Sequence, residues 1–122
     1  MDANEFQIEA HKFADYPSPV IYETTGDQSF TRHLDYVYPA LALAEEAGEV
    51  AGKYAKAVRD CNGNIDAERK EAIKKELGDV MWFVAELSTK LGLTLEEVMA
   101  ANIEKLTSRK NRGVIHGSGD NR

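Results

Sequence analysis

The sequence has one cysteine, three prolines and one tryptophan, and its 21 acidic residues outnumber 15 basic ones. A single cysteine, Cys61, cannot form an internal disulfide, which fits either a reducing compartment or a residue that carries no information about the compartment. The formal charge of −6 argues against a nucleic-acid polymer as partner, because such a face needs clustered Lys and Arg. Apolar runs are too short to span a membrane. The N-terminal MDANEFQIEA has acids where a signal peptide has bases and an apolar stretch.

A length of 122 residues is typical of one domain and can bury a core without a disulfide or a structural metal. We therefore expect residues 1–122 to form a single, cytoplasmic domain. Two prolines and a glycine interrupt residues 15–31, which predicts a loop. Residues 110–122 are rich in glycine and basic side chains, and they predict a C-terminal tail without a helical stripe.

Four segments with apolar residues at helical spacing predict four helices. Their expected ranges are 3–14, 32–60, 67–91 and 95–108. Asp66 is a candidate N-cap of the third helix, and Thr94 with Glu97 forms a candidate capping box for the fourth. No convincing strand pair is found, so the predicted fold class is all-α, a four-helix bundle.

Helical phase predicts where the acids of the second and third helices point. At about 100° per residue, Glu45 lies about 40° from both Leu41 and Glu49, so these glutamates interrupt the apolar stripe of the second helix. Glu76 and Asp79 likewise fall on the core-facing stripe of the third helix. The carboxylates of two helices are therefore expected to face the interior rather than the solvent.

Such a placement is costly, because an unpaired carboxylate in an apolar setting loses several kcal/mol. The acids must then be paired, protonated or bound to a metal. Mg²⁺ prefers oxygen ligands and leaves positions open for water and phosphate. The pattern predicts a Mg²⁺ site between the second and third helices. The alternative is a set of partly exposed glutamates paired with nearby lysines, namely Lys53, Lys56, Lys74 or Lys75.

Two short motifs carry a family resemblance. LAEEAGEV at 43–50, followed by ELGDV at 76–80, resembles the EExxE…ExxD pattern of the MazG-like all-α NTP pyrophosphohydrolases. The likeness extends from about Tyr38 to Arg112 and includes NIEKL at 102–106. The acids that match the pattern are Glu45, Glu46, Glu49, Glu76 and Asp79.

The resemblance implies a four-helix core that assembles as a homodimer or homotetramer. It implies hydrolysis of a nucleoside triphosphate between the α and β phosphates, with Mg²⁺ as cofactor and Mn²⁺ able to substitute. The implied metal ligands are Glu46, Glu49, Glu76 and Asp79. Glu45, Glu46 and Glu49 are the implied catalytic acids, with Glu45 orienting the attacking water or a metal ligand.

Seven further side chains are candidates for contacting the nucleotide. They are Lys53, Lys56, Phe83, Asn102, Lys105, Arg109 and Arg112. The two lysines of the second helix would reach phosphates and Phe83 would stack on a base, whereas the resemblance implies the roles of Asn102 and Lys105. The basic tail would fold over the triphosphate. Each also has a structural alternative: core packing, an internal hydrogen bond of Asn102, solvated charge, or a disordered tail.

The leading functional hypothesis is a Mg²⁺-dependent pyrophosphohydrolase of standard or modified (d)NTPs. A phosphoribosyl-ATP pyrophosphohydrolase, which has a similar acidic motif, is an alternative, as is a non-catalytic helical binding or regulatory module. A carboxylate-bridged di-iron bundle needs Glu-x-x-His pairs, and none of the three histidines has a glutamate three residues earlier. The sequence does not identify the preferred base or sugar.

Overall fold

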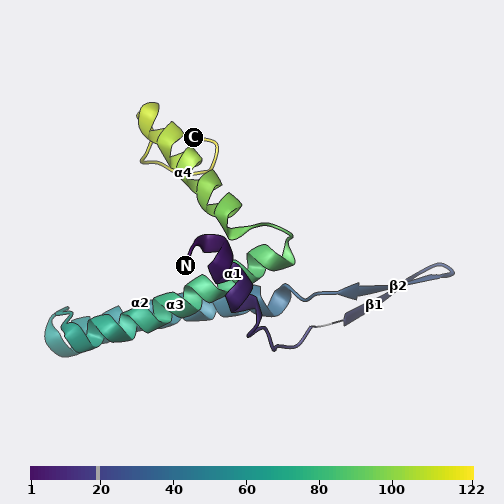
Figure 1. Ribbon diagram of the computed structural model, residues 1–122, viewed down its shortest axis with the longest axis horizontal. Coiled ribbons are helices and arrows are strands. Elements are labelled where there is room, and N and C mark those ends of the chain that lie inside the picture. The colour runs from purple at the N-terminus through teal and green to yellow at the C-terminus, as the bar shows by residue number, and fades with distance from the viewer. Residues whose placement is uncertain (19) are drawn as a thin grey trace.

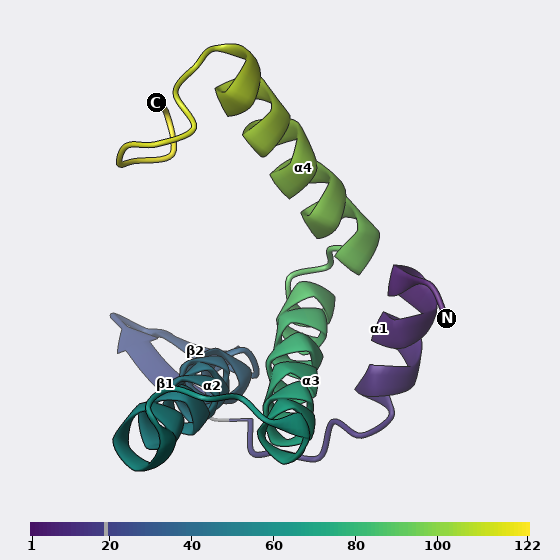
Figure 2. The ribbon, with the colours of Figure 1, turned by 90° about the vertical axis from the view of Figure 1, so that its left-hand side faces the viewer.

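The computed structural model describes residues 1–18 and 20–122. Its elements are α1 (Ala3–His11), β1 (Val20–Thr25), β2 (Gln28–His33), α2 (Val37–Cys61), α3 (Ala67–Lys90) and α4 (Leu95–Asn111). Helices α2 and α3 form a long hairpin, α1 lies beside α3, and α4 extends away from the hairpin (Figure 1, Figure 2). The described chain is thus mostly helical, with four helices and one small sheet, which confirms the predicted fold class.

Local capping interactions set the helix ends. Asp66 accepts a hydrogen bond from the Arg69 backbone N–H at 2.9 Å, and Thr94 with Glu97 forms a complete capping box. At the end of α2, Gly63 has a φ of 77° and its N–H reaches the carbonyl of Ala57 at 2.9 Å. These predicted starts and stops are therefore confirmed.

The second helix begins at Val37, so the predicted start near Arg32 is wrong. Pro39 lies in the first turn of α2, where its missing N–H has no helical bond to lose. Further into the helix the same ring would clash with the preceding turn. The proline therefore fixes the position of the helix start, which apolar spacing alone does not.

Most of residues 15–31 is not a loop, and the expectation of no strand pair is wrong. Strands β1 and β2 pair antiparallel, with Val20 opposite His33 and Thr25 opposite Gln28. Gly26 has a φ of 61°, which suits the first residue of a two-residue hairpin turn. Every residue of β1 is exposed, so the strand lacks the apolar alternation that would have revealed it. Pro19 of the predicted loop lies outside the described residues.

The β-hairpin projects from the end of the α2–α3 hairpin that is opposite to the α2–α3 turn (Figure 1). Within the part of the chain that the structure describes, it contacts none of the helices. Its residues are therefore held by their own ladder and by the two connections to the helical part. Across residues 1–18 and 20–122, no helix is both long and apolar enough to cross a membrane.

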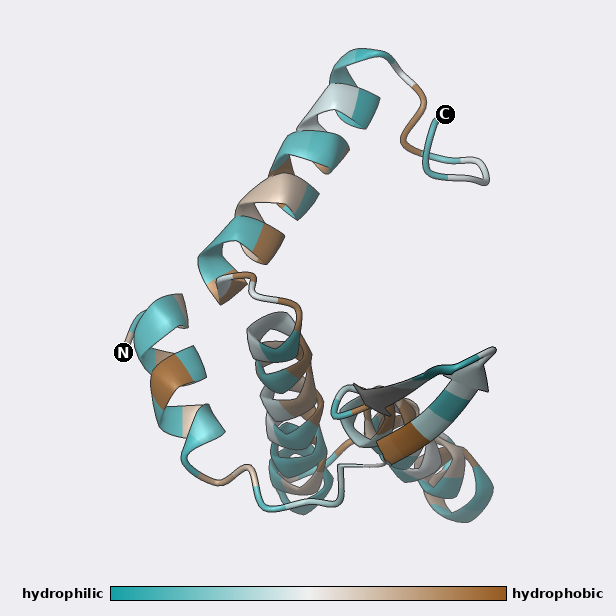
Figure 3. Cartoon of the chain, turned by 90° about the vertical axis from the view of Figure 1, so that its right-hand side faces the viewer, coloured by the Kyte–Doolittle hydropathy of each residue, from teal (hydrophilic) through white to brown (hydrophobic). Residues whose placement is uncertain are grey.

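The core is small and lies where α1, α3 and α4 meet. Ala10, Ala85 and Leu95 are buried there, with Phe6 and Trp82 packed against them. In contrast, large apolar side chains remain exposed on α2, α3 and α4, among them Leu41 at 69% and Ile103 at 63%. Figure 3 colours the chain by hydropathy and shows apolar positions along α4, which extends away from the α2–α3 hairpin. The accessible surface is 9019 Å², against about 6,600 Å² for a compact monomer of this mass.

Candidate metal centre

Three carboxylates meet between α2 and α3. Glu46 comes from α2, and Glu76 and Asp79 come from α3, where they are three residues apart and so share a face. One carboxylate oxygen of each lies within 4.8 Å of those of the other two. Glu46 and Glu76 are half-buried and Asp79 is exposed. The structure therefore brings together three of the four acids that the resemblance implies as metal ligands.

Like charges surround Glu46. Partial burial raises the pKa of Glu46, and repulsion from Asp79, Glu45, Glu76 and Glu49 raises it further. Both Glu45 and Glu49 are exposed and lie outside the three-residue group, although their charges still act on Glu46. Because the donors are hard carboxylate oxygens and repel one another, a divalent cation such as Mg²⁺ fits the group chemically.

Lys53 supplies the opposite charge. Its Nζ lies 2.8 Å from Glu76 Oε1, and this bond, with the charge of Glu76, raises the pKa of Lys53. The alternative of lysine-paired glutamates thus holds for Glu76. It does not hold for the whole group, since the nearby charges acting on Glu46 are all negative.

An aromatic hollow of about 360 Å³ adjoins the carboxylates. It is lined by Phe13, Glu46, Asp79, Trp82 and Phe83. Phe83 is buried, with edge-to-face ring contacts to Trp82 at 4.7 Å and Tyr38 at 6.2 Å between centroids. Trp82 also donates its indole N–H to the carbonyl of Ala10 at 2.9 Å. Phe83 therefore lies beside the acids, as its predicted contact with a base requires.

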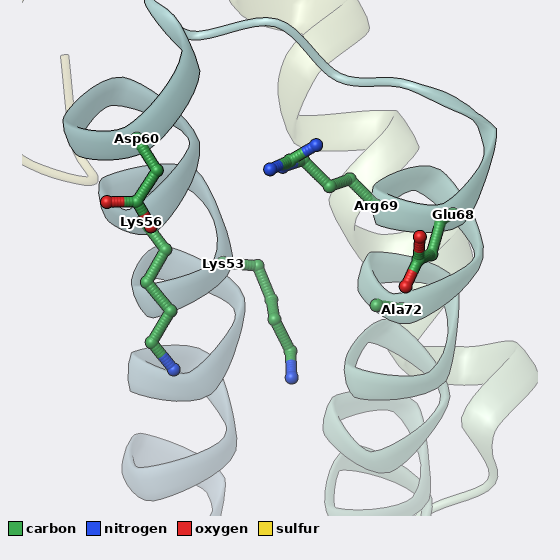
Figure 4. Close-up of a pocket in the computed structure, with 6 residues that line it drawn as sticks. All are labelled: Lys53, Lys56, Asp60, Glu68, Arg69 and Ala72. Atoms are coloured by element: carbon green, nitrogen blue, oxygen red, sulfur yellow. The ribbon is translucent and has the colours of Figure 1, made fainter.

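Lys56 lies nearer the α2–α3 turn, where a second hollow is lined by three basic side chains from facing helices (Figure 4). Lys53 belongs to this hollow too and so lies between it and the carboxylates. The third basic residue, Arg69, was not among the predicted site residues. The sequence could have indicated Arg69, because it lies on the facing helix about two turns before Glu76.

Asn102 and Lys105 are not close to the carboxylates. They lie on α4 and line a largely apolar groove with Leu95 and Val98, and α4 makes no contact with α2 among the described residues. Asn102 is exposed rather than buried in this structure. Sequence spacing assigns Asn102 and Lys105 to the core-facing side of α4, but both are exposed in the described part of the chain.

The tail folds back against α4 rather than over the carboxylates. Arg109 is only 5% exposed, and its Nη2 donates to the carbonyls of Gly119 at 3.3 Å and Asp120 at 2.9 Å. Arg112 donates to the carbonyl of Arg122 at 2.8 Å. Lys105 lies 3.8 Å from the Asp120 carboxylate. These basic residues therefore bind the tail in this structure, and the tail is ordered against the helix.

Sequence reasoning missed a buried carboxylate on α3. Glu86 is 1% exposed, accepts a short hydrogen bond from the Tyr16 hydroxyl, and lies 2.8 Å from His11 Nδ1 and 3.6 Å from Lys90 Nζ. Burial acts to raise the pKa of Glu86, but hydrogen bonds from Tyr16 and His11, with nearby positive charge, outweigh it and lower that pKa. The sequence hints at the buried position of Glu86 through its spacing, because Glu86 follows Trp82 by one helical turn and so lies on the same face of α3.

Comparisons with known proteins agree with the resemblance. The family model described as the MazG nucleotide pyrophosphohydrolase domain matches residues 39–114. The Gene 37 protein of Mycobacterium phage L5 is 44% identical over 122 residues, which is the full length of both chains. The uncharacterized protein YvdC of Bacillus subtilis (strain 168) is 41% identical over 76 residues, covering 55% of this chain and 68% of that protein. No solved structure matches the chain.

Proposed function

Because the chain belongs to the MazG nucleotide pyrophosphohydrolase domain family, we propose that it hydrolyses (d)NTPs between the α and β phosphates, releasing (d)NMP and pyrophosphate. The observation that carries this proposal is the group of Glu46, Glu76 and Asp79 on facing helices, with their oxygens within 4.8 Å of one another. Three acids of like charge at this distance repel one another, and a bound cation would relieve that repulsion.

Mg²⁺ is the proposed cofactor, with Mn²⁺ as a substitute. Glu46, Glu76 and Asp79 would hold it, and Glu49, three residues after Glu46, would add a fourth carboxylate. When bound, the cation would neutralise phosphate charge and make a water molecule a better nucleophile. Lys53 holds the Glu76 carboxylate through its 2.8 Å ion pair, and Glu45 would orient the attacking water.

The aromatic hollow is the proposed site of the nucleobase. Phe83 is fixed by its edge-to-face contacts with Trp82 and Tyr38, so a base stacking there would lose little additional side-chain freedom. The hollow shares Glu46 and Asp79 with the carboxylate group. A base in the hollow would therefore leave its phosphates beside those acids.

Self-association is part of the proposal. The accessible surface of 9019 Å² exceeds that of a compact monomer by about 2,400 Å², which is more than the roughly 800 Å² that each partner buries in a standard protein–protein interface. Exposed apolar side chains lie on three helices. Asn102 and Lys105 are on α4, which does not contact α2 in the described chain. A contribution from these two residues to the nucleotide site would therefore come from a second copy. Sedimentation equilibrium tests this, since a monomer at micromolar concentration contradicts it.

The decisive experiment is a pyrophosphate-release assay with Mg²⁺ over all standard and several modified (d)NTPs, with phosphoribosyl-ATP as a further substrate. We expect turnover of at least one (d)NTP, and loss of turnover in Glu46→Gln. Glu71→Gln is the matched control, because Glu71 is an exposed acid of α3 whose partner is Lys74 at 3.3 Å. Release of orthophosphate, or no turnover of any substrate, contradicts the proposal, and turnover of phosphoribosyl-ATP alone favours the alternative enzyme.

A further inference from the structure

A basic hollow lies at the turn end of the α2–α3 hairpin. Its volume is about 290 Å³. Figure 4 shows the side chains of Lys53 and Arg69 reaching between the two helices, and the amines of Lys53 and Lys56 directed away from the turn. The residues that line it are Lys53, Lys56, Asp60, Glu68, Arg69 and Ala72.

The charges of this hollow leave basic groups available for a ligand. Asp60 is engaged by Arg59, at 2.6 Å from Nε and 2.8 Å from Nη2. None of the described residues forms an ion pair with Lys56. Asp66 binds Arg69 through Nη1 alone, at 2.7 Å, which leaves the other N–H groups of the guanidinium for further acceptors.

The hollow lies on the same groove as the carboxylates, on the side away from the aromatic rings. Arg69 is seven residues before Glu76, or about 10.5 Å along α3, and Phe83 is four residues after Asp79, or about 6 Å. Lys53 joins the two sites, because it lines the hollow and binds Glu76. The order along the hairpin is therefore aromatic rings, carboxylates, then basic side chains.

We propose that Lys53, Lys56 and Arg69 form a subsite for the two terminal phosphates of the triphosphate, which leave as pyrophosphate. This inference rests on the proposed function, since it assumes that the α–β bridge lies at the carboxylates. A guanidinium binds phosphate oxygens in pairs and an ammonium adds a point charge. The small side chain of Ala72 leaves room for such a group between the helices.

The subsite predicts the orientation of the substrate. The base lies against Phe83, the scissile bond lies at Glu46, Glu76 and Asp79, and the leaving group lies toward the turn. A nucleoside monophosphate product would make no contact with Lys56 or Arg69. The protein would therefore bind pyrophosphate and monophosphate at separable places, and pyrophosphate would compete with the triphosphate for the basic hollow.

The test is calorimetric titration of the full chain with inorganic pyrophosphate in excess Mg²⁺. We expect Lys56→Gln and Arg69→Gln each to weaken pyrophosphate binding about ten-fold, and to raise KM for the (d)NTP with little change in kcat. Lys70→Gln is the control, because it removes the same charge from an exposed residue of α3 that does not line the hollow. Pyrophosphate affinity that is unmeasurable in the wild type, or equal in wild type and variants, overturns the inference.

The two proposals fail separately. If (d)NTPs are hydrolysed but both variants bind pyrophosphate like the wild type, the function stands and the subsite is wrong. If no (d)NTP is hydrolysed but the variants weaken pyrophosphate binding, the anion subsite stands and the proposed function is wrong. Should Arg69→Gln unfold by losing its Asp66 contact, Lys56→Gln still decides, since it breaks no ion pair among the described residues.

Discussion

Two carboxylate sites lie on α3, about two helical turns apart, and their environments are opposite. Glu86 is 1% exposed, yet its pKa is lowered, because Tyr16 and His11 donate to it and outweigh its burial. At the other site Glu46 is less buried, yet its pKa is raised by partial burial and by repulsion from acidic neighbours. The hydrogen-bond donors around each carboxylate, rather than its burial, account for the opposite pKa shifts of Glu86 and Glu46.

Glu86 stabilises the fold through its hydrogen bonds, whereas the mutual repulsion of Glu46, Glu76 and Asp79 is what a bound cation would relieve under the proposed function. The partners of Glu86 come from α1 and from the segment after it, so the buried carboxylate fixes this N-terminal part onto α3. Among the described residues, Lys53 alone forms an ion pair with the group of Glu46, Glu76 and Asp79. Mutations at the first site should therefore act on stability, and mutations at the second should act on activity.

The largest expected effect is on activity. Glu46→Gln and Asp79→Asn should each lower kcat/KM by at least about 100-fold, because each removes a carboxylate from the proposed cation site. The free energy of unfolding should stay the same or rise, since repulsion is relieved. Steady-state assays and urea denaturation measure the two quantities. Retained activity, or a large loss of stability, would remove the distinction between the two sites.

The second-largest expected effect is a change in thermal stability when a divalent metal ion is added, and it should differ between the two sites. A divalent cation that binds only the folded chain stabilises it by about 2.7 kcal/mol at a concentration 100-fold above its Kd. Mg²⁺ should therefore raise the Tm of the wild type and of Glu86→Gln, but not that of Glu46→Gln. Potassium chloride at matched ionic strength is the control for charge screening. An equal rise in the Tm of all three proteins would show that Mg²⁺ does not act at the carboxylate group of Glu46, Glu76 and Asp79.

Glu86→Gln should have the opposite effect to Glu46→Gln: it should lower stability and leave activity nearly unchanged. The amide keeps the shape but has one acceptor oxygen where the carboxylate has two, so Tyr16 or His11 loses its acceptor at a buried site, which costs about 1–3 kcal/mol of stability. Activity of the folded fraction should change little, because Glu86 is not among the residues lining the aromatic hollow. Urea denaturation of this variant beside Glu104→Gln, an exposed acid of α4, measures the effect. A loss of activity without a loss of stability would assign Glu86 to the catalytic site.

The smallest expected effect is on the pH dependence of stability. A carboxylate with a lowered pKa in the folded state adds stability above its unfolded-state pKa, and this is lost as the pH falls through the folded value. The wild type should therefore lose stability below about pH 4.5, the ordinary value for Glu86. Glu86→Gln should show a shallower decline when unfolding is followed from about pH 7 to about pH 3. Parallel curves would mean that Glu86 does not titrate with folding.

The parts that sequence predicts well are those that local rules determine. The cap residues Asp66 and Thr94 act where expected. Helical phase placed Glu45 and Glu49 on the interior stripe, but both are exposed and lie outside the carboxylate group, and only the family motif indicated Glu46. The caps depend on residues within one helical turn of each other, and the carboxylate group depends on the pairing of two helices that follow one another in sequence. The exposed β-hairpin gave no such signal, because β1 buries none of its residues.

The parts that sequence could not supply depend on distant contacts. Glu86 and His11 are 75 positions apart, and nothing near either residue indicates the other. Asn102 is assigned to a buried stripe by its spacing but is exposed in the described part of the chain. Arg109 has the charge of a phosphate ligand, yet the carbonyls of the tail take up its donors.

The placement of the cluster on adjacent helices also bears on folding kinetics. All three acids lie within residues 46–79 on the α2–α3 hairpin, whereas the bonds between α1 and the start of α4 join residues up to 92 positions apart. Contacts between sequence neighbours form first, because they close shorter loops. Repulsion among the acids then opposes an early step of folding. A divalent cation is therefore expected to speed the folding of this chain as well as to stabilise its native state.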